Sequence, residues 1–423
     1  MIIFMAILII VLIIAGLPIF IGILAAAILG LYAGQISLSA IPIEILRLAS
    51  SPILLAIPLF TFAGYLLGEG NTSGRLVRFS RSLFGWIPGG LGVVALVSCS
   101  FFTAITGATG ITIIALGGLL LPALVSEGYD ENFSLGLLTS SGSLGLHFPP
   151  SLPIILYGFV SGVSIERLFI AGLLPGLLMV GILCVFSVVM GKRWRLERPP
   201  FSGSEFISSF KDAAWELPIP LLIIAGIYSG FCTATEAAAL TVVYVFTIKT
   251  VIFKELTITG DMPRIMIESM KIVGGIMIIL GAALGFTNYL VDAFVPMRIL
   301  QVMEGIVSSK IGFLLIMNLF LILVGCMMDI FSAILIVVPL IIPLADRFGI
   351  DPLHLGVIFM ANLGIGYNTP PVGLNLFIAS SRFDRPMLQL YRSTLPFLLL
   401  LLFSLILITY WPSLSLFLPG LLE

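Results

Sequence analysis

The sequence is poor in charge and in residues that bind metals. Charged residues make up 10% of the 423 residues, and the two histidines are His147 and His354. Soluble globular chains carry about 25% charged residues. The net charge of −1 offers no basic surface, so we expect no nucleic-acid partner. The sequence has no His-Glu-x-x-His motif and no Walker-type phosphate loop, which argues against zinc hydrolysis and against ATP use.

Cysteine is also scarce. Cys99, Cys184, Cys232 and Cys326 lie in apolar runs and show neither a metal-ligand spacing nor a paired disulfide spacing. We interpret them as packing residues. The N-terminus lacks the basic region of a signal peptide, because the first Lys or Arg is Arg47. We therefore expect residues 1–34 to be mature membrane segments.

Apolar residues are abundant instead, at 59% of the chain with a mean hydropathy of +1.21. A soluble fold has no place for so much apolar surface, whereas a lipid bilayer solvates it. The composition predicts an all-α polytopic membrane protein with about 10 transmembrane helices. The apolar segments are 2–15, 17–34, 51–68, 89–126, 132–160, 168–191, 217–231, 237–253, 272–291, 311–345, 353–380 and 393–418. Residues 1–34 are short for two spans, so one crossing and two crossings both stay open.

Two of these runs, 89–126 and 311–345, are too long for one span and carry small or polar residues near their middle. We predict a re-entrant helical hairpin for each. Fifteen of the 20 Lys and Arg then fall on one side, in 69–88, 192–216, 249–271 and 381–392. The positive-inside rule makes that side cytoplasmic, so the hairpins enter from opposite sides. Residues 192–216 form a cytoplasmic linker whose Trp and basic residues fit an interfacial helix.

The chain repeats itself at a shift of 221 residues. Five proline pairs coincide at this shift, where chance gives roughly one. The pairs are Pro42/Pro263, Pro122/Pro343, Pro149/Pro370, Pro150/Pro371 and Pro175/Pro396, with Gly64/Gly285, Gly128/Gly349, Asp130/Asp351 and Gly145/Gly366 at the same shift. An odd number of crossings separates matching elements. Residues 1–191 and 217–423 are thus inverted repeats, which are typical of secondary transporters.

The two matched breaks, 145–151 and 366–372, lie in the middle of their spans and each contains Pro-Pro. Consecutive prolines free backbone carbonyls, and lipid offers those carbonyls no partner. A Na⁺ ion accepts carbonyl and hydroxyl oxygens without a carboxylate. The tip of the first hairpin adds the hydroxyls of Thr103, Thr106 and Thr109.

Three further polar residues lie in or near these breaks and the second hairpin. A charge at the depth of Asp329 is a functional candidate, and it also suits a helix N-cap at the hairpin tip. His147 has a proton-coupling role or is a neutral pocket residue. Asn375 points to substrate or joins helices by hydrogen bonds. Asp130 and Asp351 lie in short turns, and we predict that both cap helices.

Four stretches together resemble the large membrane subunit of tripartite ATP-independent periplasmic (TRAP) transporters, essentially from end to end. They are Ser100-Phe-Phe-Thr-Ala-Ile-Thr-Gly-Ala-Thr, Phe148-Pro-Pro-Ser-Leu-Pro-Ile-Ile-Leu-Tyr-Gly, Asp329 in its hairpin, and Thr369-Pro-Pro-Val-Gly-Leu-Asn-Leu-Phe. The resemblance implies an elevator-type, Na⁺-driven importer of organic acids (carboxylates) in a bacterial or archaeal inner membrane. It also implies two partners, a small four-helix membrane subunit and a periplasmic substrate-binding protein, and we expect neither to be fused to this chain.

The resemblance also carries over a set of site residues. The first Na⁺ site comprises Thr103, Thr106, Gly145, Phe148 and Pro150, and the second comprises Gly325, Gly366, Thr369 and Val372. The substrate lies between the hairpin tips near Asp329 and Ser151, with Thr109, His147 and Asn375 as further candidates. The family usually has Ser-Gly-Ser where this chain has Thr106-Gly107-Ala108, which leaves the substrate contact of that tip open.

Three other classes of protein agree less well with the sequence. An intramembrane enzyme needs paired acids, a metal motif or a nucleophile with its base, and Asp329 has no intramembrane acidic partner in the predicted topology. A channel has no need of two opposed hairpins. The nearest alternative is a stand-alone proton- or Na⁺-coupled anion transporter or antiporter of related inverted-repeat fold, against which the scarcity of intramembrane acids argues.

Overall fold

The computed structural model describes residues 19–35, 37–39, 41–43, 46, 50–196, 200–294 and 309–421. Apart from turns and short linking segments, the described residues form helices, and seven helices are long and apolar enough to cross a membrane. A helix satisfies every backbone hydrogen bond within one segment, which is the requirement that lipid imposes on apolar runs. The prediction of an all-α polytopic membrane protein is confirmed.

The first half of the chain places short helices at the predicted hairpin and break. Its elements are α2 (Ile19–Ala33), η1 (Pro52–Leu55), α4 (Ala56–Gly68), α5 (Thr72–Phe84), α6 (Gly90–Thr106), α7 (Thr109–Thr112), the π-helical η2 (Ile113–Gly117), α8 (Gly118–Ser126), α9 (Glu131–Ser141), η3 (Leu144–His147), α10 (Leu152–Ser161), α11 (Ile165–Ala171) and α12 (Leu173–Trp194).

The second half repeats this order after the linker helix. Its elements are α13 (Gly203–Ala213), α14 (Ile219–Tyr228), α15 (Ala234–Thr247), the π-helical η4 (Ile248–Ile252), α16 (Asp261–Asp292), α18 (Lys310–Met327), α19 (Ile330–Arg347), α20 (Pro352–Gly366), α21 (Leu374–Phe383), α22 (Met387–Tyr410) and α23 (Ser413–Leu421).

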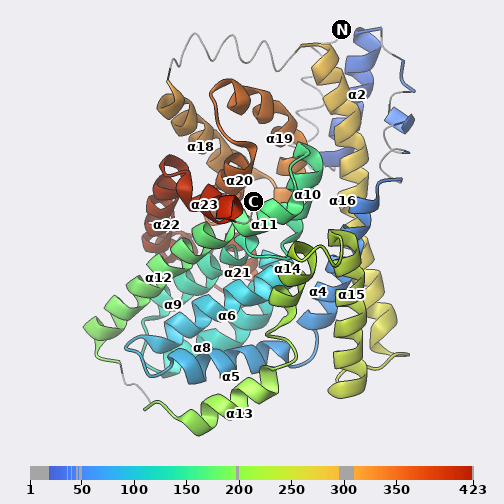
Figure 1. The fold of residues 1–423 in the computed structure, drawn as a ribbon. Helices are drawn as coiled ribbons and strands as arrows, with labels where there is room; N and C mark the ends of the chain where they lie inside the picture. The colour runs from blue at the N-terminus through green and yellow to red at the C-terminus, as the bar shows by residue number, and fades with distance from the viewer. Residues whose placement is uncertain are drawn as a thin grey trace.

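The two long runs each form a pair of helices joined by a short turn. The run of α7, η2 and α8 covers 109–126, and α19 covers 330–347, so their ends differ by 221 residues. In Figure 1, α6 and α8 lie at the lower end of the molecule, and α18 and α19 lie at the upper end. The hairpins thus approach the middle from opposite ends, in the arrangement that the inverted repeat predicts.

The two predicted breaks are also present. The helical stretch Glu131–His147 and the helix Leu152–Ser161 are bent by 44° at the first Pro-Pro. The second Pro-Pro lies between α20 and α21, and both Pro-Pro peptide bonds are cis. Asp130 accepts a hydrogen bond from the Phe133 N–H, and Asp351 accepts one from the Leu353 N–H. The prediction that these two acids are N-caps is confirmed.

One predicted segment extends past its helix. The segment 393–418 is not one helix, because Pro412 prevents Trp411 from continuing α22 and the chain restarts as α23. The segment 168–191 lies within one candidate membrane span, Ile165–Trp194, which comprises α11 and α12 with a local division at Gly172. The segment 2–15 and the number of crossings within 1–34 lie outside the described residues, of which α2 is the first element.

Four helices form a scaffold beside the unit that holds the hairpins and breaks. We use "scaffold" for α2, α4, α15 and α16, which pack as the pairs α2 with α16, α4 with α15, and α4 with α16. Figure 1 shows α2 and α16 standing along one side of the molecule, with α18, α22 and α12 on the other side. The shift of 221 relates α2 to α15 and α4 to the second half of α16, so the scaffold itself has the internal symmetry.

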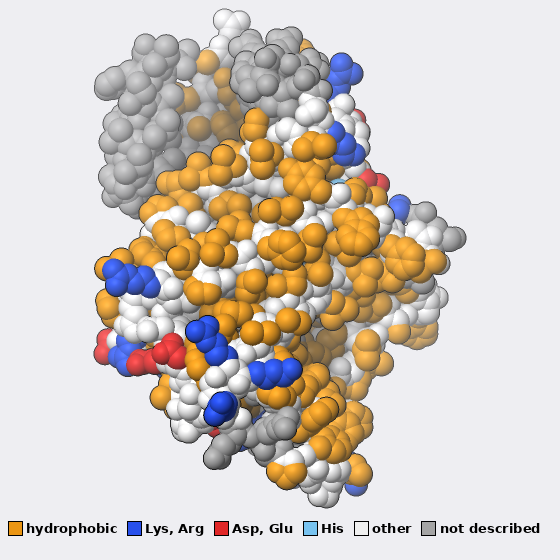
Figure 2. Space-filling view, turned by 90° about the vertical axis from the view of Figure 1, so that its left-hand side faces the viewer, with side chains coloured by type: hydrophobic (Ala, Val, Ile, Leu, Met, Phe, Trp, Pro, Cys, Tyr) orange, Lys and Arg blue, Asp and Glu red, His pale blue; other side chains and the backbone are white. Residues whose placement is uncertain are grey.

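The surface fits a membrane protein. Figure 2 shows a broad band of hydrophobic side chains, with many of the Lys and Arg side chains on this face near the lower end. The linker helix α13 lies at that end and packs against α5. Its Ile207 and Phe210 are exposed. These features fit the interfacial helix predicted for the linker.

Candidate functional site

The first hairpin is in close contact with the first break. Gly145 touches α6 so closely that a Cβ atom added to it would lie 2.3 Å from the Ser100 carbonyl oxygen. Thr103 is buried, and its hydroxyl lies 2.6 Å from the Thr112 hydroxyl and 2.9 Å from the Gly142 carbonyl oxygen. The structure therefore brings together Thr103 and Gly145, two residues assigned to the first Na⁺ site.

The turn of the first hairpin explains its glycine. Gly107 follows α6 with φ of +67°, a conformation that a side chain disfavours. The Thr106 hydroxyl donates to the Phe102 carbonyl at 2.9 Å, so its lone pairs stay available. Thr109 begins α7, and its carbonyl lies against Gly142. The tip therefore presents its polar atoms to the break.

The second hairpin repeats this contact at the second break. A Cβ added to Gly366 would lie 2.6 Å from the Gly325 Cα atom. Gly325 is the 221-shift mate of Ala104, whose backbone nitrogen lies 2.7 Å from a Cβ added to Gly145. The Gly373 N–H also donates to the Cys326 carbonyl at 2.9 Å. Each half thus uses a matched glycine to bring its hairpin onto its break.

Asp329 caps the second hairpin. Its carboxylate accepts from the Ser332 N–H at 3.0 Å and from the Ser332 hydroxyl at 2.5 Å. The Tyr367 hydroxyl accepts a 2.5 Å hydrogen bond from the Ile330 N–H and so fastens the same tip to the second break. The predicted N-cap is confirmed, and Asp329 stays partly exposed at the tip.

Amide side chains join the two breaks. Asn368 donates to the Ser143 hydroxyl at 3.2 Å, and Asn375 donates to the Asn368 side-chain oxygen at 3.3 Å and to the Thr139 carbonyl at 3.4 Å. Sequence reasoning missed the role of Ser143, because nothing in the spacing says that it meets a residue 225 positions away. The network makes Asn375 a link between the two halves.

Several buried oxygens at this junction have no partner among the described residues. They belong to Ser140, Ser151 and Asn375, whose side chains are all fully buried. Buried polar atoms in proteins are normally hydrogen-bonded, so unpartnered oxygens mark places where a ligand, an ion or water binds. The set consists of uncharged oxygens, which suits a monovalent cation better than a divalent one.

Other predicted residues lie at the edges of this set. The Thr369 hydroxyl donates to the Ile365 carbonyl at 2.9 Å, and Val372 is exposed. The ring of Phe148 packs against Gly176 of α12. Pro150 is buried within the first break.

His147 lines a small cavity beside the first break. It is buried and lines a cavity of about 10 Å³, and neither ring nitrogen has a partner among the described residues. The other lining residues are Ile154, Tyr157, Leu168, Gly172, Gly356, Val357 and Met360. The cavity is apolar and no larger than one water molecule requires. The structure thus encloses His147 mainly among residues of α10, α11 and α20.

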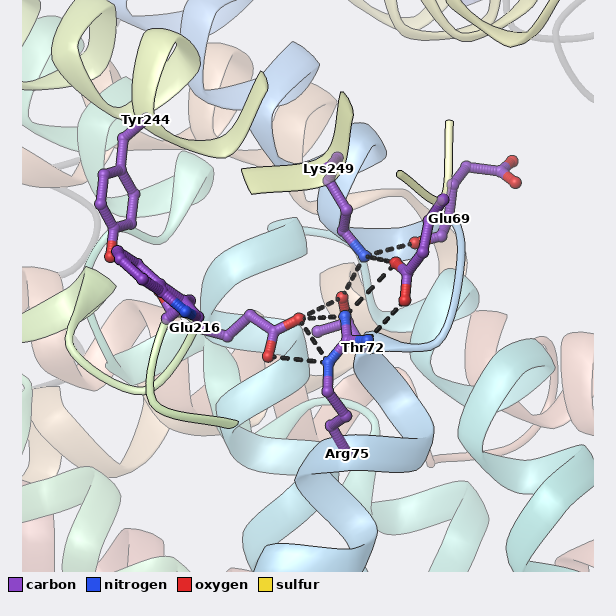
Figure 3. Close-up of polar contacts among 8 residues, drawn as sticks. Glu69, Thr72, Arg75, Glu216, Tyr244 and Lys249 are labelled. Carbon is purple, nitrogen blue, oxygen red and sulfur yellow. Dashed lines mark hydrogen bonds and ion pairs between the residues drawn. The ribbon is translucent and has the colours of Figure 1, made fainter. Parts of the chain in front are cut away.

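A second polar cluster, which the sequence did not reveal, joins the scaffold to α5. Arg75 forms ion pairs with Glu216 and Glu255, and its guanidinium lies 3.9 Å from the centre of the Phe253 ring. Lys249 is fully buried and donates to Glu255 at 2.8 Å and to the Thr72 hydroxyl at 2.6 Å. Figure 3 shows Arg75, Glu216 and Lys249 converging on Thr72.

This ionic cluster has equal numbers of opposite charges. Burial alone would raise the pKa of Glu255, but the ion pairs with Arg75 and Lys249 outweigh it and lower that pKa to about 2. The four charged residues come from three segments, 69–88, 192–216 and 249–271, which the charge count put on one side of the membrane. Their meeting supports that assignment.

Comparison with known proteins identifies the family. Residues 6–414 match the family described as "Tripartite ATP-independent periplasmic transporter, DctM component". The C4-dicarboxylate TRAP transporter large permease protein DctM of Pseudomonas aeruginosa is 35% identical over 385 residues, covering 91% of this chain and 90% of that protein. The isethionate TRAP transporter permease protein DctMQ of Oleidesulfovibrio alaskensis is 35% identical over 411 residues. The match covers 96% of this chain but 64% of that longer protein.

A solved structure supports the fold. The YdaH transporter of Alcanivorax borkumensis superposes with a TM-score of 0.61 at 14% identity, over 88% of this chain and 87% of that one. An identity this low supports the fold alone. Sequence, hairpins, breaks and relatives agree, and the chain belongs to the family of the large permease subunits of TRAP transporters.

Proposed function

We propose that this subunit imports an organic anion across the inner membrane by an elevator movement, and that a Na⁺ gradient drives this import. The observation that supports this proposal most directly is a pair of glycine contacts that recur at the shift of 221. Gly145 contacts α6, and Gly366 contacts Gly325. They hold each hairpin to its break, so that hairpins and breaks form one body. Unpartnered oxygens lie where the two breaks meet.

The residues present suit Na⁺ as a co-transported ion. Thr103 and Gly145 are in contact at the first site, and Gly325 and Gly366 are in contact at the second. The Gly145 and Gly366 carbonyls each accept one backbone hydrogen bond, from Phe148 and Thr369 respectively, and retain a second lone pair. Carbonyl and hydroxyl oxygens satisfy a monovalent cation without a carboxylate. We assign the first site to Thr103, Thr106, Gly145, Phe148 and Pro150, and the second to Gly325, Gly366, Thr369 and Val372.

The substrate class is an organic anion, a carboxylate in the first instance. The two relatives named above are described as handling C4-dicarboxylates and isethionate, which are both anions. We place the anion between the hairpin tips, where Ser151 and Asn375 offer polar groups and α7, α10, α19 and α21 begin. Helix N-termini favour negative charge. Bound Na⁺ supplies positive charge beside the anion, which this uncharged set of residues lacks.

The mechanism follows from two bodies that pack internally. The scaffold helices pair with one another, and the hairpins are fastened to the breaks through Gly145, Gly366 and Tyr367. Binding at the breaks orders both hairpin tips and completes the anion pocket. The filled unit then moves along the scaffold, so that the pocket opens on the other side.

We infer that two partners complete the transporter, as the family description "tripartite" implies. One is a small membrane subunit, and the relative called DctMQ is described as a single permease protein of greater length. The other is a periplasmic binding protein that delivers the anion. Its presence puts the complex in an inner membrane.

The test is uptake of labelled organic anions into proteoliposomes. This chain is reconstituted with and without the small subunit and the binding protein, with and without an inward Na⁺ gradient. Uptake that needs all three proteins and Na⁺ supports the proposal. Uptake by this chain alone, driven by a proton gradient, would overturn it in favour of a stand-alone anion transporter.

A matched pair of variants tests the first Na⁺ site. Thr103→Val removes the hydroxyl beside Gly142 but keeps the side-chain shape, and we expect a several-fold rise in the Na⁺ concentration for half-maximal uptake. Thr61→Val is the control, since the buried Thr61 hydroxyl bonds only within α4, to the Ile57 carbonyl at 2.6 Å. An equal effect of both variants would contradict the site.

A further inference from the structure

Two glycines matched by the repeat have different neighbours. Gly64 of α4 touches the tip of the first hairpin, because a Cβ added to it would lie 2.9 Å from the Ile105 carbonyl oxygen and from the Thr106 Cα atom. Its mate, Gly285 of α16, meets Ile41 instead, with an added Cβ 3.0 Å from the Ile41 Cγ1 atom. Gly64 thus contacts a hairpin tip of its own half, whereas the matched Gly285 contacts Ile41, a residue of the first half.

The tip of the second hairpin lacks the contact that the first tip has. The mates of Ile105 and Thr106 are Cys326 and Met327. Thr106 is 1% exposed, whereas Met327 is 64% exposed. An apolar side chain at the matched position is therefore uncovered, although the corresponding position in the first half is buried against the scaffold.

The same difference occurs at the helices that follow the breaks. α10 packs against α4, but among the described residues α21 has no comparable packing on α16. Leu156 of α10 is fully buried, and its mate Phe377 of α21 is 50% exposed. The second hairpin does contact the scaffold, because α19 packs on α16, but the tip residue Met327 and the α21 residue Phe377 stay exposed where their mates in the first half are buried.

The asymmetry is confined to the boundary between the two bodies. Within the scaffold, α2 packs on α16 as α15 packs on α4, and within the moving unit Gly145 meets α6 as Gly366 meets α18. These contacts within each body keep the symmetry of the repeat, whereas the contacts of Gly64 and Gly285 at the boundary do not. In a protein with two inverted halves, the two bodies can pack in a second arrangement. In that arrangement, the second half makes the boundary contacts that the first half makes here, and the first half makes those of the second.

We propose that Gly285 is the receiving surface for the tip of the second hairpin in the opposite-facing state of the transporter. In that state Cys326 and Met327 lie on Gly285 as Ile105 and Thr106 now lie on Gly64, and Ile41 has withdrawn. The tip of the first hairpin leaves Gly64 at the same time. The proposal rests on the alternating movement proposed above and names a contact that this movement creates.

Phe377 supports the choice of occupant. The exposed face of α21 includes Leu374, Phe377 and Ser381, and the mates of its apolar members belong to α10. In the first half, α10 packs on α4, and the shift of 221 relates α4 to the second half of α16. In the opposite-facing state, the second half of α16 is therefore the surface that covers α21. Met327 and Phe377 thus share one partner helix, and both become buried in one movement.

Paired cysteines test the contact. In a background without the four native cysteines that still transports, Gly285→Cys is combined with Met327→Cys. The control pair combines Gly285→Cys with Leu319→Cys, which lies exposed two turns earlier on α18. A disulfide needs Cβ atoms about 3.5–4.5 Å apart. We expect oxidation to crosslink 285 with 327 but not with 319, and reduction to restore uptake that the crosslink had blocked.

Mass spectrometry of the crosslinked peptides reports the contact without relying on uptake. Absence of the 285–327 crosslink in a double variant that transports before oxidation would overturn the proposal, and so would equal crosslinking of 285 to 319. Failure of uptake in the cysteine-free background concerns the transport function instead, so the two failures are distinguishable.

A volume exchange gives a second test. Gly285→Leu alone collides with Ile41, but combined with Ile41→Ala it fits the present arrangement and fills the receiving surface. We expect this double variant to keep its melting temperature and to lose uptake at least tenfold. Ile41→Ala alone is the matched control and should retain uptake. Full uptake by the double variant would refute the role of Gly285.

Discussion

Neutralising one member of the ionic cluster should destabilise the protein strongly. Glu216 is fully buried and accepts hydrogen bonds from the Thr72 hydroxyl at 3.1 Å and from the Arg75 Nε atom at 3.0 and 3.1 Å, besides its ion pair with the Arg75 Nη2 atom. Glu216→Gln leaves the Arg75 guanidinium facing an amide that donates hydrogen bonds. Removing one partner of a buried ion pair costs about 3–5 kcal/mol, because the other charge remains desolvated.

The size of this effect comes from burial, so an exposed pair on the same helix is the proper control. Arg78 lies one turn further along α5 and pairs with Glu205 at 2.7 Å, but both side chains are about half exposed. Water screens such a pair and replaces its partner when one is removed. Arg78→Gln should therefore leave the stability essentially unchanged.

Thermal unfolding of the detergent-solubilised protein, followed by tryptophan fluorescence, measures both effects. Glu216→Gln and Arg75→Gln should each lower the melting temperature well below that of Arg78→Gln. The double variant Arg75→Gln with Glu216→Gln should lose less than the sum of the single losses, since it leaves no isolated charge between them. Strictly additive losses, or single losses no larger than that of Arg78→Gln, would refute the buried-network reasoning.

Three further outcomes follow from the same contacts. Gly366→Ala should abolish most uptake, since the added Cβ collides with Gly325, whereas Gly364→Ala two residues earlier meets nothing closer than 3.5 Å and should transport normally. The pKa of Glu255 is below its unfolded value, so its stabilising effect is complete above pH about 4.5 and is lost as the pH falls towards 2. The melting temperatures of wild type and Glu255→Gln should converge over that range. Asn368→Ala should lower uptake several-fold by separating the breaks, as measured in proteoliposomes.

The overall arrangement of the helices was predictable, because it follows from the lengths of the apolar runs and from the internal repeat. A run as long as 89–126 does not fit one bilayer crossing, and a match such as Gly145 with Gly366 needs only counting. The break at Trp411-Pro412 was also readable, since the residue before proline avoids the helical conformation, but the apolar run concealed it. The hydrophobic pattern predicts the long apolar segments, but it does not predict where such a segment divides into shorter helices.

The contacts of the site were predictable in part. The proline breaks and the tip glycines named segments that the structure brings into contact, and Thr103 does meet Gly145. The orientation of His147 was not predictable, because the residues that enclose its cavity come from α10, α11 and α20. Glu216 and Lys249 are ordinary charges at the ends of apolar runs. Their burial depends on Arg75, which lies 141 residues from Glu216, and no local pattern records that pairing.

Buried charges and buried uncharged polar groups lie in different places in the protein. Full charges are buried in the cluster around Arg75, where every charged partner is matched and breaking one pair is expensive. At the breaks the buried groups are hydroxyls, amides and carbonyls, several of them without a partner. For the ion site proposed above, uncharged oxygens would bind the ion more weakly than carboxylates, and they are less costly than carboxylates to bury in an apolar environment when empty. In the mechanism proposed above, a permanent acid at the junction of the breaks would bind the ion more tightly and raise the free-energy cost of moving the empty unit through the membrane, so the scarcity of charge in the sequence agrees with that mechanism.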